Sequence, residues 1–317
     1  MIPKRNHLVF DRAPQNPILS AADWPYPANS VFNAGATKLQ DGTTLLLCRV
    51  EAMNGVSHLC AARSDDGVGD WRIDLEPTLA PHPEHPEEEW GVEDPRITYL
   101  PDEGRFAVLY TAYSHNGPGV ALALTEDFVS FERGGVIFSP EDKDAALFPR
   151  RFGGRWAAIH RPVTQDSANI FMSFSSDLSG WGQSRCILEA RRGPYWDANK
   201  VGLSPPPIET SEGWLVMYHG VKRTGSGRLY RNGLALFDLG QPDKLLRRGD
   251  AWVFGPSEPY ERVGDVDDVV FPCGFTVDDD GDTLNLYYGA ADTSIGLAHA
   301  SLRDLLAWLR ENDRALP

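Results

Sequence analysis

The sequence predicts an all-β fold, and within that class a five-bladed β-propeller with a short C-terminal helix, formed as a single domain over residues 1–317. Glycine-containing turns recur at intervals of about 50 to 70 residues, which is a spacing typical of repeat architectures. Helical periodicity is scarce before residues 302–310. A hydrophobic fraction of 42%, with nine Trp and fourteen Phe, is sufficient for the core of packed sheets.

Each repeat begins with a strand, a turn and a second strand. The five turns are residues 40–42, 102–104, 153–154, 211–213 and 279–281. The expected preceding strands are residues 33–39, 94–100, 145–152, 201–210 and 269–277. The expected following strands are residues 43–49, 105–113, 155–161, 214–219 and 283–288.

A third strand, rich in small residues and mostly ending near an acid, continues each unit. These strands are expected at residues 60–65, 121–127, 172–177, 233–238 and 296–301. Units of three or four antiparallel strands repeated radially are propeller blades. A pair of β-sandwiches is the alternative, but it would not explain the regular recurrence. The amphipathic segment 302–310 is expected to be a helix that covers an edge or joins a partner subunit of a homo-oligomer.

Composition excludes several classes of function. A formal charge of −15 argues against a nucleic-acid partner, whose phosphates require a basic face. The sequence contains no apolar run of 18 residues, so it predicts no membrane span, and residues 1–10 lack the pattern of a signal peptide. We therefore expect a cytoplasmic protein, with buried free thiols at Cys48, Cys60, Cys186 and Cys273.

The repeat predicts where polar residues meet. If the first strand of each unit is innermost, its start and the end of the antiparallel second strand lie at one mouth of the central channel. The starts are Asn33, Asp94, Lys143 with Asp144, Lys200, and Asp267 with Asp268. The ends are Arg49 with Glu51, Tyr113, His160 with Arg161, His219, and Tyr288 leading to Asp292. Polar strand ends are common because loops are solvated, but the chemical diversity of this set favours a site.

Asp94 lies in the most distinctive local motif, residues 90–98. Pro95 biases it towards an extended conformation, and Arg96 follows two residues later. A carboxylate fixed in this way suits a general acid. A structural Asp–Arg pair explains the same residues, and the local sequence leaves both interpretations open.

A second constellation is basic, and it consists of Arg161, Lys200 and His219. Cationic side chains are costly to desolvate without a partner. The partner is either a bound oxyanion, which Arg recognises with two parallel hydrogen bonds, or one of the many acids nearby. No G-x-x-x-x-G-K-[ST] segment occurs, so a phosphate would not be held by a P-loop.

Other motifs point to structure rather than chemistry. Residues 82–89 contain two His and several Glu, but their prolines favour a solvated acidic loop over a metal site. Residues 278–282 lack the register of a calcium loop and are expected to form a hairpin turn. No G-x-S-x-G segment suggests a serine hydrolase. We expect no metal and no cofactor.

The chain resembles glycoside hydrolase family 130, the β-mannoside phosphorylases and related mannosidases, which are five-bladed propellers. The resemblance covers nearly the whole chain. It rests on residues 91–97, 145–149 leading to 160–162, 213–220, 270–274 and 287–292.

This resemblance implies roles for the residues at the predicted mouth. Asp94 corresponds to the family's proton donor, whose proton is thought to pass through the 3-hydroxyl of the bound mannose. Asn33, Arg49 and Asp292 correspond to residues that hold the mannosyl unit, and Arg161, Lys200 and His219 to residues that bind phosphate. The remaining expected contacts are Lys143 to phosphate, and Arg96, Tyr113 and Asp144 to substrate.

The chain departs from the family at one place. Many phosphorylases of the family carry an Arg-Asn pair where this chain has Lys143 and Asp144. Lysine keeps the positive charge but loses the planar fork, and Asp144 adds a negative charge beside it. Both changes put the tightness of phosphate binding in question.

The expected reaction is inverting phosphorolysis of a β-mannoside, with inorganic phosphate as co-substrate and an oligosaccharide as partner. One alternative is a β-mannosidase that uses water, with Glu51, Glu93, Asp144 or Asp268 as base. Another is a non-catalytic sugar-binding propeller. The choice between β-1,2 and β-1,4 linkages stays open, because loops such as residues 84–90 and 222–231 would set it. The second loop is glycine-rich and is expected to be a mobile lid.

Overall fold

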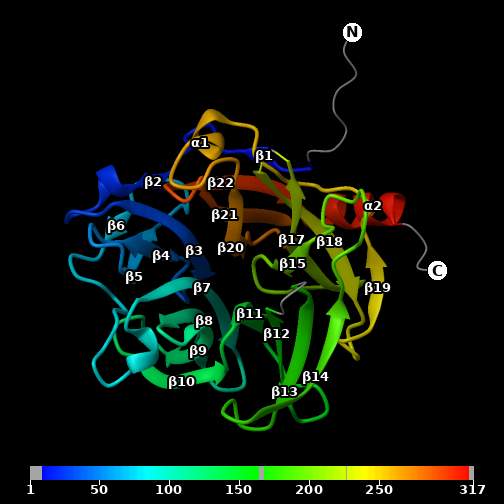
Figure 1. Cartoon of the computed structure of the whole chain (residues 1–317), viewed down its shortest axis with the longest axis horizontal. Coiled ribbons are helices and arrows are strands. Elements are labelled where there is room, and N and C mark those ends of the chain that lie inside the picture. The colour runs from blue at the N-terminus through cyan, green and yellow to red at the C-terminus, as the bar shows by residue number, and fades with distance from the viewer. Residues whose placement is uncertain (1–8, 164–167, 226, 314–317) are drawn as a thin grey trace.

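The computed structural model describes residues 9–163, 168–225 and 227–313, and these residues form a predominantly β structure (Figure 1). They contain twenty-two strands and two α-helices, α1 (Pro259–Arg262) and α2 (Leu302–Asn312), besides the 3₁₀ turns η1 (Ala21–Asp23) and η2 (Pro86–Glu88). The predictions of an all-β fold and of a C-terminal helix are confirmed. Residues 1–8, on which the signal-peptide expectation rests, lie outside the described part.

The strands form five antiparallel groups that follow one another along the chain. Group 1 is β3 (Ser30–Lys38), β4 (Thr44–Glu51), β5 (Ser57–Ser64) and β6 (Arg72–Ile73). Group 2 is β7 (Gly91–Leu100), β8 (Arg105–Ser114), β9 (Gly117–Thr125) and β10 (Glu132–Phe138). Group 3 is β11 (Asp142–Leu147), β12 (Trp156–Pro162), β13 (Ile170–Ser175) and β14 (Trp181–Leu188).

The last two groups contain the longest hairpin and the chain's N-terminal strands. Group 4 is β15 (Lys200–Leu203), β16 (Ile208–Thr210), β17 (Gly213–Thr224), β18 (Gly227–Phe237) and β19 (Leu245–Arg248). Group 5 is β20 (Val270–Val277), β21 (Thr283–Ala290) and β22 (Ser294–Ser301), with β1 (Asp11–Arg12) and β2 (Leu19–Ser20) both paired to β22. The first described strands therefore complete the last group.

Hydrogen bonding joins these groups into four sheets, because a parallel pairing of Ser57 with Gly91 connects groups 1 and 2. Most of the expected strands begin or end a few residues from the observed bounds, and the ends of two are set by prolines. The strand expected at residues 201–210 is divided into β15 and β16, since the prolines between them have no N–H to donate. The strand expected at residues 145–152 starts earlier and ends at Leu147, just before Pro149.

The core consists of five apolar clusters, and each cluster is shared by two neighbouring groups. The clusters join group 1 to group 2, group 2 to group 3, group 3 to group 4, group 4 to group 5, and group 5 back to group 1. The groups consequently pack in a closed cycle, as their arrangement around a common centre in Figure 1 shows. Two separate β-sandwiches would not give such a cycle.

Helix α2 contributes to this core. Its buried Leu302, Leu305, Leu306, Trp308 and Leu309 belong to the cluster between groups 4 and 5. The hydroxyl of Ser301 accepts a hydrogen bond from the Asp304 N–H and caps the helix. The helix therefore uses its apolar face within the chain, as the edge-covering alternative predicted.

The prediction for the cysteines is correct in part. All four are free thiols, and Cys48, Cys60 and Cys273 are buried. Cys186 is exposed, because it lies on β14 at the outer edge of group 3, where the side chains in the middle of the strand face solvent. In the described residues no helix is both long enough and apolar enough to cross a membrane.

Candidate active site

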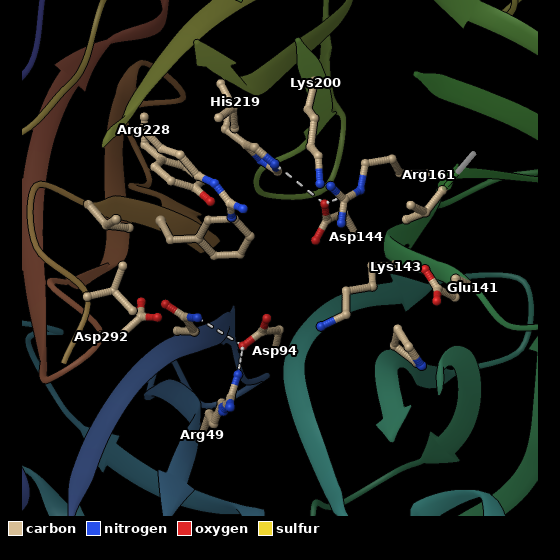
Figure 2. Close-up of a pocket in the computed structure, with 18 residues that line it drawn as sticks. Arg49, Asp94, Glu141, Lys143, Asp144, Arg161, Lys200, His219, Arg228 and Asp292 are labelled. Atoms are coloured by element: carbon tan, nitrogen blue, oxygen red, sulfur yellow. Dashed lines mark hydrogen bonds and ion pairs between the residues drawn. The ribbon is translucent and has the colours of Figure 1, made fainter. Parts of the chain in front are cut away.

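A cavity of about 460 Å³ lies where the inner strands of the five groups meet (Figure 2). Its lining is strongly charged. The acidic, basic and amide side chains in it are Asn33, Arg49, Asp94, Glu141, Lys143, Asp144, Arg161, Lys200, His219, Arg228 and Asp292. Nine of these are among the fifteen residues that the repeat placed at one mouth of the predicted channel, so the predicted convergence of distant strand ends is confirmed in part. The six that do not line the cavity are Glu51, Tyr113, His160, Asp267, Asp268 and Tyr288.

Three β-bulges present side chains to this cavity. In β3, β7 and β11 one extra residue is inserted opposite the following strand at the same relative position. The inserted regions contain Asn33, Asp94 and Asp144, with φ values of +47°, +50° and +53°. Asn and Asp tolerate this left-handed conformation better than most residues do. The repeated bulge thus explains why the sequence has Asx residues at these places, and why three of them reach one cavity.

Asp94 is held by a hydrogen-bonded cluster at one end of the cavity. Its Oδ1 accepts from the Asn33 Nδ2 at 2.9 Å and from the Arg49 Nη1 at 3.1 Å. Arg49 also donates from Nη2 to the Glu93 Oε1 at 3.1 Å. Burial would raise the pKa of Asp94, but Arg49, Lys143 and Arg96 together hold it below its ordinary value. In the free protein Asp94 is therefore an anion near pH 7.

Asp292 has the opposite electrostatic state in the same cavity. Burial, followed by the negative charge of Asp94, raises the pKa of Asp292 to about 7, although Arg49 opposes the shift. Two carboxyl groups of one cavity therefore differ in protonation, with Asp292 the group that carries a proton near neutral pH. Such pairs are frequent at functional sites.

This difference predicts a pH dependence of stability. An aspartate in the unfolded chain has a pKa of about 3.9, so between pH 4 and 7 native Asp292 holds a proton that the unfolded chain has released. Raising the pH through this window therefore favours unfolding, by at most about 1.4 kcal/mol per pH unit for one proton. Urea unfolding at pH 5, 6 and 7 should show this loss in the wild type relative to Asp292→Asn. If the free energy of unfolding changed with pH in the same way in both proteins, the predicted contribution of Asp292 would be contradicted.

At the other end of the cavity Asp144 lies among basic groups. Its Oδ2 is 2.9 Å from the Arg161 Nε and 3.5 Å from the His219 Nε2, and its Oδ1 is 3.5 Å from the Arg96 Nη2. The close contact with Arg161 has ion-pair distance but not hydrogen-bond geometry. Burial would raise the pKa of Asp144, but Arg161, His219 and Arg96 keep it lowered. The acid that marks the departure from the family pattern is thus paired with two of the expected phosphate ligands.

His219 is not a cation here. Burial, with further repulsion from Arg161, lowers its pKa to about 4 despite the attraction of Asp144. The expectation that His219 contributes positive charge is therefore wrong, since a neutral imidazole offers one N–H donor only. Between pH 4 and 6.5 this histidine affects stability in the sense opposite to Asp292, because the unfolded chain binds the proton that the native state lacks.

Lys200 supplies the clearest sign of an anion site. Burial and then the neighbouring charges of Arg161, Arg228 and Arg223 lower its pKa. Among the described residues, no carboxylate lies within ion-pair distance of the Lys200 ammonium. Cations that converge in this way repel one another, and a bound anion would relieve that repulsion.

Three predicted residues have surroundings other than those expected. Arg96 is fully buried and does not line the cavity, because it donates to the backbone carbonyls of Ser204 at 3.0 Å and Leu203 at 3.1 Å. It is a positioning residue that fixes β7 to β15. Tyr113 also lies outside the lining, and Lys143 is nearest the Glu93 carboxylate, at 3.6 Å. Arg96 therefore does not reach the cavity in this structure.

Sequence reasoning missed several lining residues, chiefly Glu141, Arg228, Tyr230 and Phe271. Arg228 and Tyr230 belong to the segment that was expected to be a mobile lid. In the described part of that segment β17 pairs with β18, with Lys222 opposite Leu229 and Thr224 opposite Gly227. A glycine-rich turn between two strand-like runs is itself a hairpin signal, so the sequence did contain this information. The described residues contain no cluster of three or more potential metal ligands.

Comparisons with known proteins agree with this geometry. The family model described as β-1,4-mannooligosaccharide phosphorylase, glycoside hydrolase family 130, matches residues 12–311. The chain is 38% identical over 256 residues to the β-1,2-mannobiose phosphorylase of Listeria innocua serovar 6a, covering 80% of this chain and 69% of that one. It is 33% identical over 314 residues to the β-1,4-mannooligosaccharide phosphorylase of Ruminococcus albus, covering 96% and 92%.

Solved structures have the same fold. The Listeria innocua β-1,2-mannobiose phosphorylase in complex with β-1,2-mannobiose superposes with a TM-score of 0.87 at 30% identity, over 95% of this chain and 99% of that one. A second structure, described in a study of family 130 glycoside hydrolases that target β-1,2-mannosidic linkages in Candida mannan, gives 0.82 at 25% identity over 96% of both chains. Because the family model matches residues 12–311 of the 317-residue chain, the chain belongs to glycoside hydrolase family 130.

Proposed function

We propose that this protein is an inverting β-mannoside phosphorylase. The observation that carries the proposal is a single cavity with a carboxylate held by Arg49 and Asn33 at one end and the cations Arg161, Lys200 and Arg228 at the other. Relatives of both linkage specificities are phosphorylases by name, at 33–38% identity. Their substrates, β-linked manno-oligosaccharides and phosphate, are those we propose here.

We further propose that the five strand groups are the blades of a five-bladed β-propeller and that the chain is a single domain. The closed cycle of apolar clusters supports this arrangement, since each cluster joins one blade to the next. The pairing of β1 and β2 with β22 supports it as well, because it joins the two ends of the chain in one blade. Free thiols fit a reducing compartment, and we propose the cytoplasm.

In the proposed reaction, Asn33, Arg49 and Asp292 hold the non-reducing mannosyl unit. Phosphate, held by Arg161, Lys200 and Arg228 with one N–H from His219, attacks the anomeric carbon from the face opposite the leaving oxygen. The new carbon–oxygen bond to phosphate forms as the glycosidic bond breaks, and Asp94 gives a proton to the leaving oxygen, directly or through a sugar hydroxyl. The products are α-mannose 1-phosphate and an acceptor shortened by one unit.

One carboxylic acid suffices for this chemistry. An inverting hydrolase needs a second carboxylate to activate water, whereas phosphate is already an anion. The cations also stabilise charge on the phosphate as the oxocarbenium-like transition state develops. A bound phosphate offsets the field of Lys143, which helps keep Asp94 ionised in the free protein. Phosphate binding should therefore raise the pKa of Asp94 and favour its acid form.

Asp144 should weaken phosphate binding, because it already neutralises Arg161 and approaches His219. Asp144→Asn removes this competing charge and leaves the amide close in shape. We expect inorganic phosphate to bind the variant roughly 10-fold more tightly, a change of about 1.4 kcal/mol. The rise of melting temperature with phosphate concentration measures this affinity. An equal or smaller rise in the variant would show that Asp144 does not compete with the anion.

The decisive experiment is incubation with β-1,2- and β-1,4-mannobiose, with and without inorganic phosphate. We expect sugar phosphate to form only when phosphate is present. Mannose released at equal rates without phosphate would identify a β-mannosidase. Binding without turnover of either disaccharide would identify a sugar-binding protein and reject the proposed reaction.

A further inference from the structure

A partly exposed aromatic group lies in group 2, beside the start of β7 and the end of β8. It consists of Trp90, Tyr113 and His115, and we call it the Trp90 platform. The Trp90 side chain is 43% exposed, although large aromatic side chains are usually buried. Its ring centroid is 5.3 Å from that of Tyr113 and 6.5 Å from that of His115, and both rings are nearly perpendicular to the indole. Neither neighbour therefore stacks on the indole.

The platform is continuous with the cavity. Tyr113 on β8 pairs directly with Pro118 on β9, and Pro118 lines the cavity. Strand alternation places Tyr113 on the same face of group 2 as Leu109, which packs against group 3. Glu141 and Lys143, which line the cavity on that side, belong to the start of group 3. The aromatic surface thus begins at the rim and extends outward.

The distance from the reacting centre suits a second binding site. Trp90 precedes Asp94 by four residues and lies immediately before β7, the strand that contains Asp94. At about 3.3 Å per strand residue, the two are separated by on the order of 13 Å. That is beyond the sugar bonded to the reacting mannosyl unit but within reach of a longer chain.

The platform is held in place before any ligand binds. The backbone N–H of Trp90 donates to the backbone carbonyl of Tyr113 at 2.8 Å, and Gly91 pairs with Tyr113 in the strand register. The His115 Nδ1 lies 3.2 Å from the Glu89 Oε2. An apolar ring face is therefore bordered by a carboxylate and an imidazole, which is the pattern that suits a pyranose, with its apolar C–H face and hydroxyl rim.

We propose that the Trp90 platform binds a distal sugar of the acceptor, so that the enzyme favours manno-oligosaccharides longer than the disaccharide. This inference rests on the proposed function, since it takes its ligand class from it. Tyr113, which was expected to contact substrate within the cavity, would then act outside it by supporting Trp90.

The test measures chain-length preference without turnover. In an Asp94→Asn background, calorimetry with the disaccharide and the tetrasaccharide of each β-mannosyl linkage should give tighter binding of one tetrasaccharide, by roughly 10-fold. Adding Trp90→Ala should remove this gain, and Trp90→Phe should retain part of it. Tyr99→Ala is the matched control and should keep the gain, because Tyr99 is 37% exposed near the end of β7, whereas Trp90 immediately precedes its start.

Two results would overturn the inference while leaving the proposed function intact. In the first, the tetrasaccharide still binds more tightly than the disaccharide after Trp90→Ala is added. In the second, the Asp94→Asn protein binds both lengths equally well. In either case the wild type would still cleave the disaccharide in a phosphate-dependent reaction. Failure of both lengths and both linkages to bind or react would reject the proposed function and the platform together.

Discussion

Replacing Asp94 by Asn should lower phosphorolytic turnover by about 100- to 10,000-fold, the usual contribution of a general acid. The amide has nearly the same shape as the carboxyl group and can accept a hydrogen bond from Arg49, but it has no acidic proton for the leaving oxygen. Arg49 also keeps its contact with Glu93, so the fold should survive. Initial rates of sugar phosphate formation, with melting temperature as a check of folding, measure the effect.

Two neighbouring carboxyl groups provide the controls. Glu93→Gln removes a negative charge from the same Arg49 cluster without removing the proposed acid, so its effect on turnover should be much smaller. Asp292→Asn tests the carboxyl group that carries a proton near neutral pH and should mainly weaken substrate binding, because Asp292 is proposed to hold the sugar. If Asp292→Asn lost more turnover than Asp94→Asn, the roles of the two carboxyl groups would have to be exchanged.

Strand order and the convergence of strand ends could be predicted because both follow from periodicity. Glycine turns and apolar runs identify the inner and second strands, and antiparallel pairing then requires Asn33 and Arg49, or Asp94 and Tyr113, to lie at one end. The bulges could not be predicted. An extra residue in a strand leaves the apolar pattern almost unchanged, although it is what turns Asn33, Asp94 and Asp144 into the cavity.

The surroundings of the charged groups depend on contacts between distant segments. Arg96 was expected beside substrate, but β15 ends at Leu203, and the prolines that follow cannot continue the pairing. The carbonyls of Leu203 and Ser204 therefore need donors, and Arg96 supplies them. The neutral state of His219 likewise follows from burial, which no local motif of the sequence expresses.

The second large effect is expected at Arg161. Arg161→Ala should raise the KM for phosphate by roughly 10- to 150-fold, the equivalent of one charge-assisted hydrogen bond of about 1.5–3 kcal/mol. Arg161→Lys keeps the charge but loses the planar fork, so it should fall between the wild type and Arg161→Ala. The KM for the mannoside should change much less, since Arg161 lies at the opposite end of the cavity from Arg49 (Figure 2). Initial rates over a matrix of both substrates separate the two constants.

A double variant distinguishes loss of phosphate binding from loss of structure. Arg161→Ala leaves buried Asp144 with less compensation, which alone would destabilise the protein. Arg161→Ala/Asp144→Asn removes both charges and should recover the melting temperature without recovering the phosphate affinity of Asp144→Asn. A KM for phosphate that returned with stability would show that Arg161 acts only by neutralising Asp144. The anion would then be bound by Lys200 and Arg228, which face the cavity without this counterion.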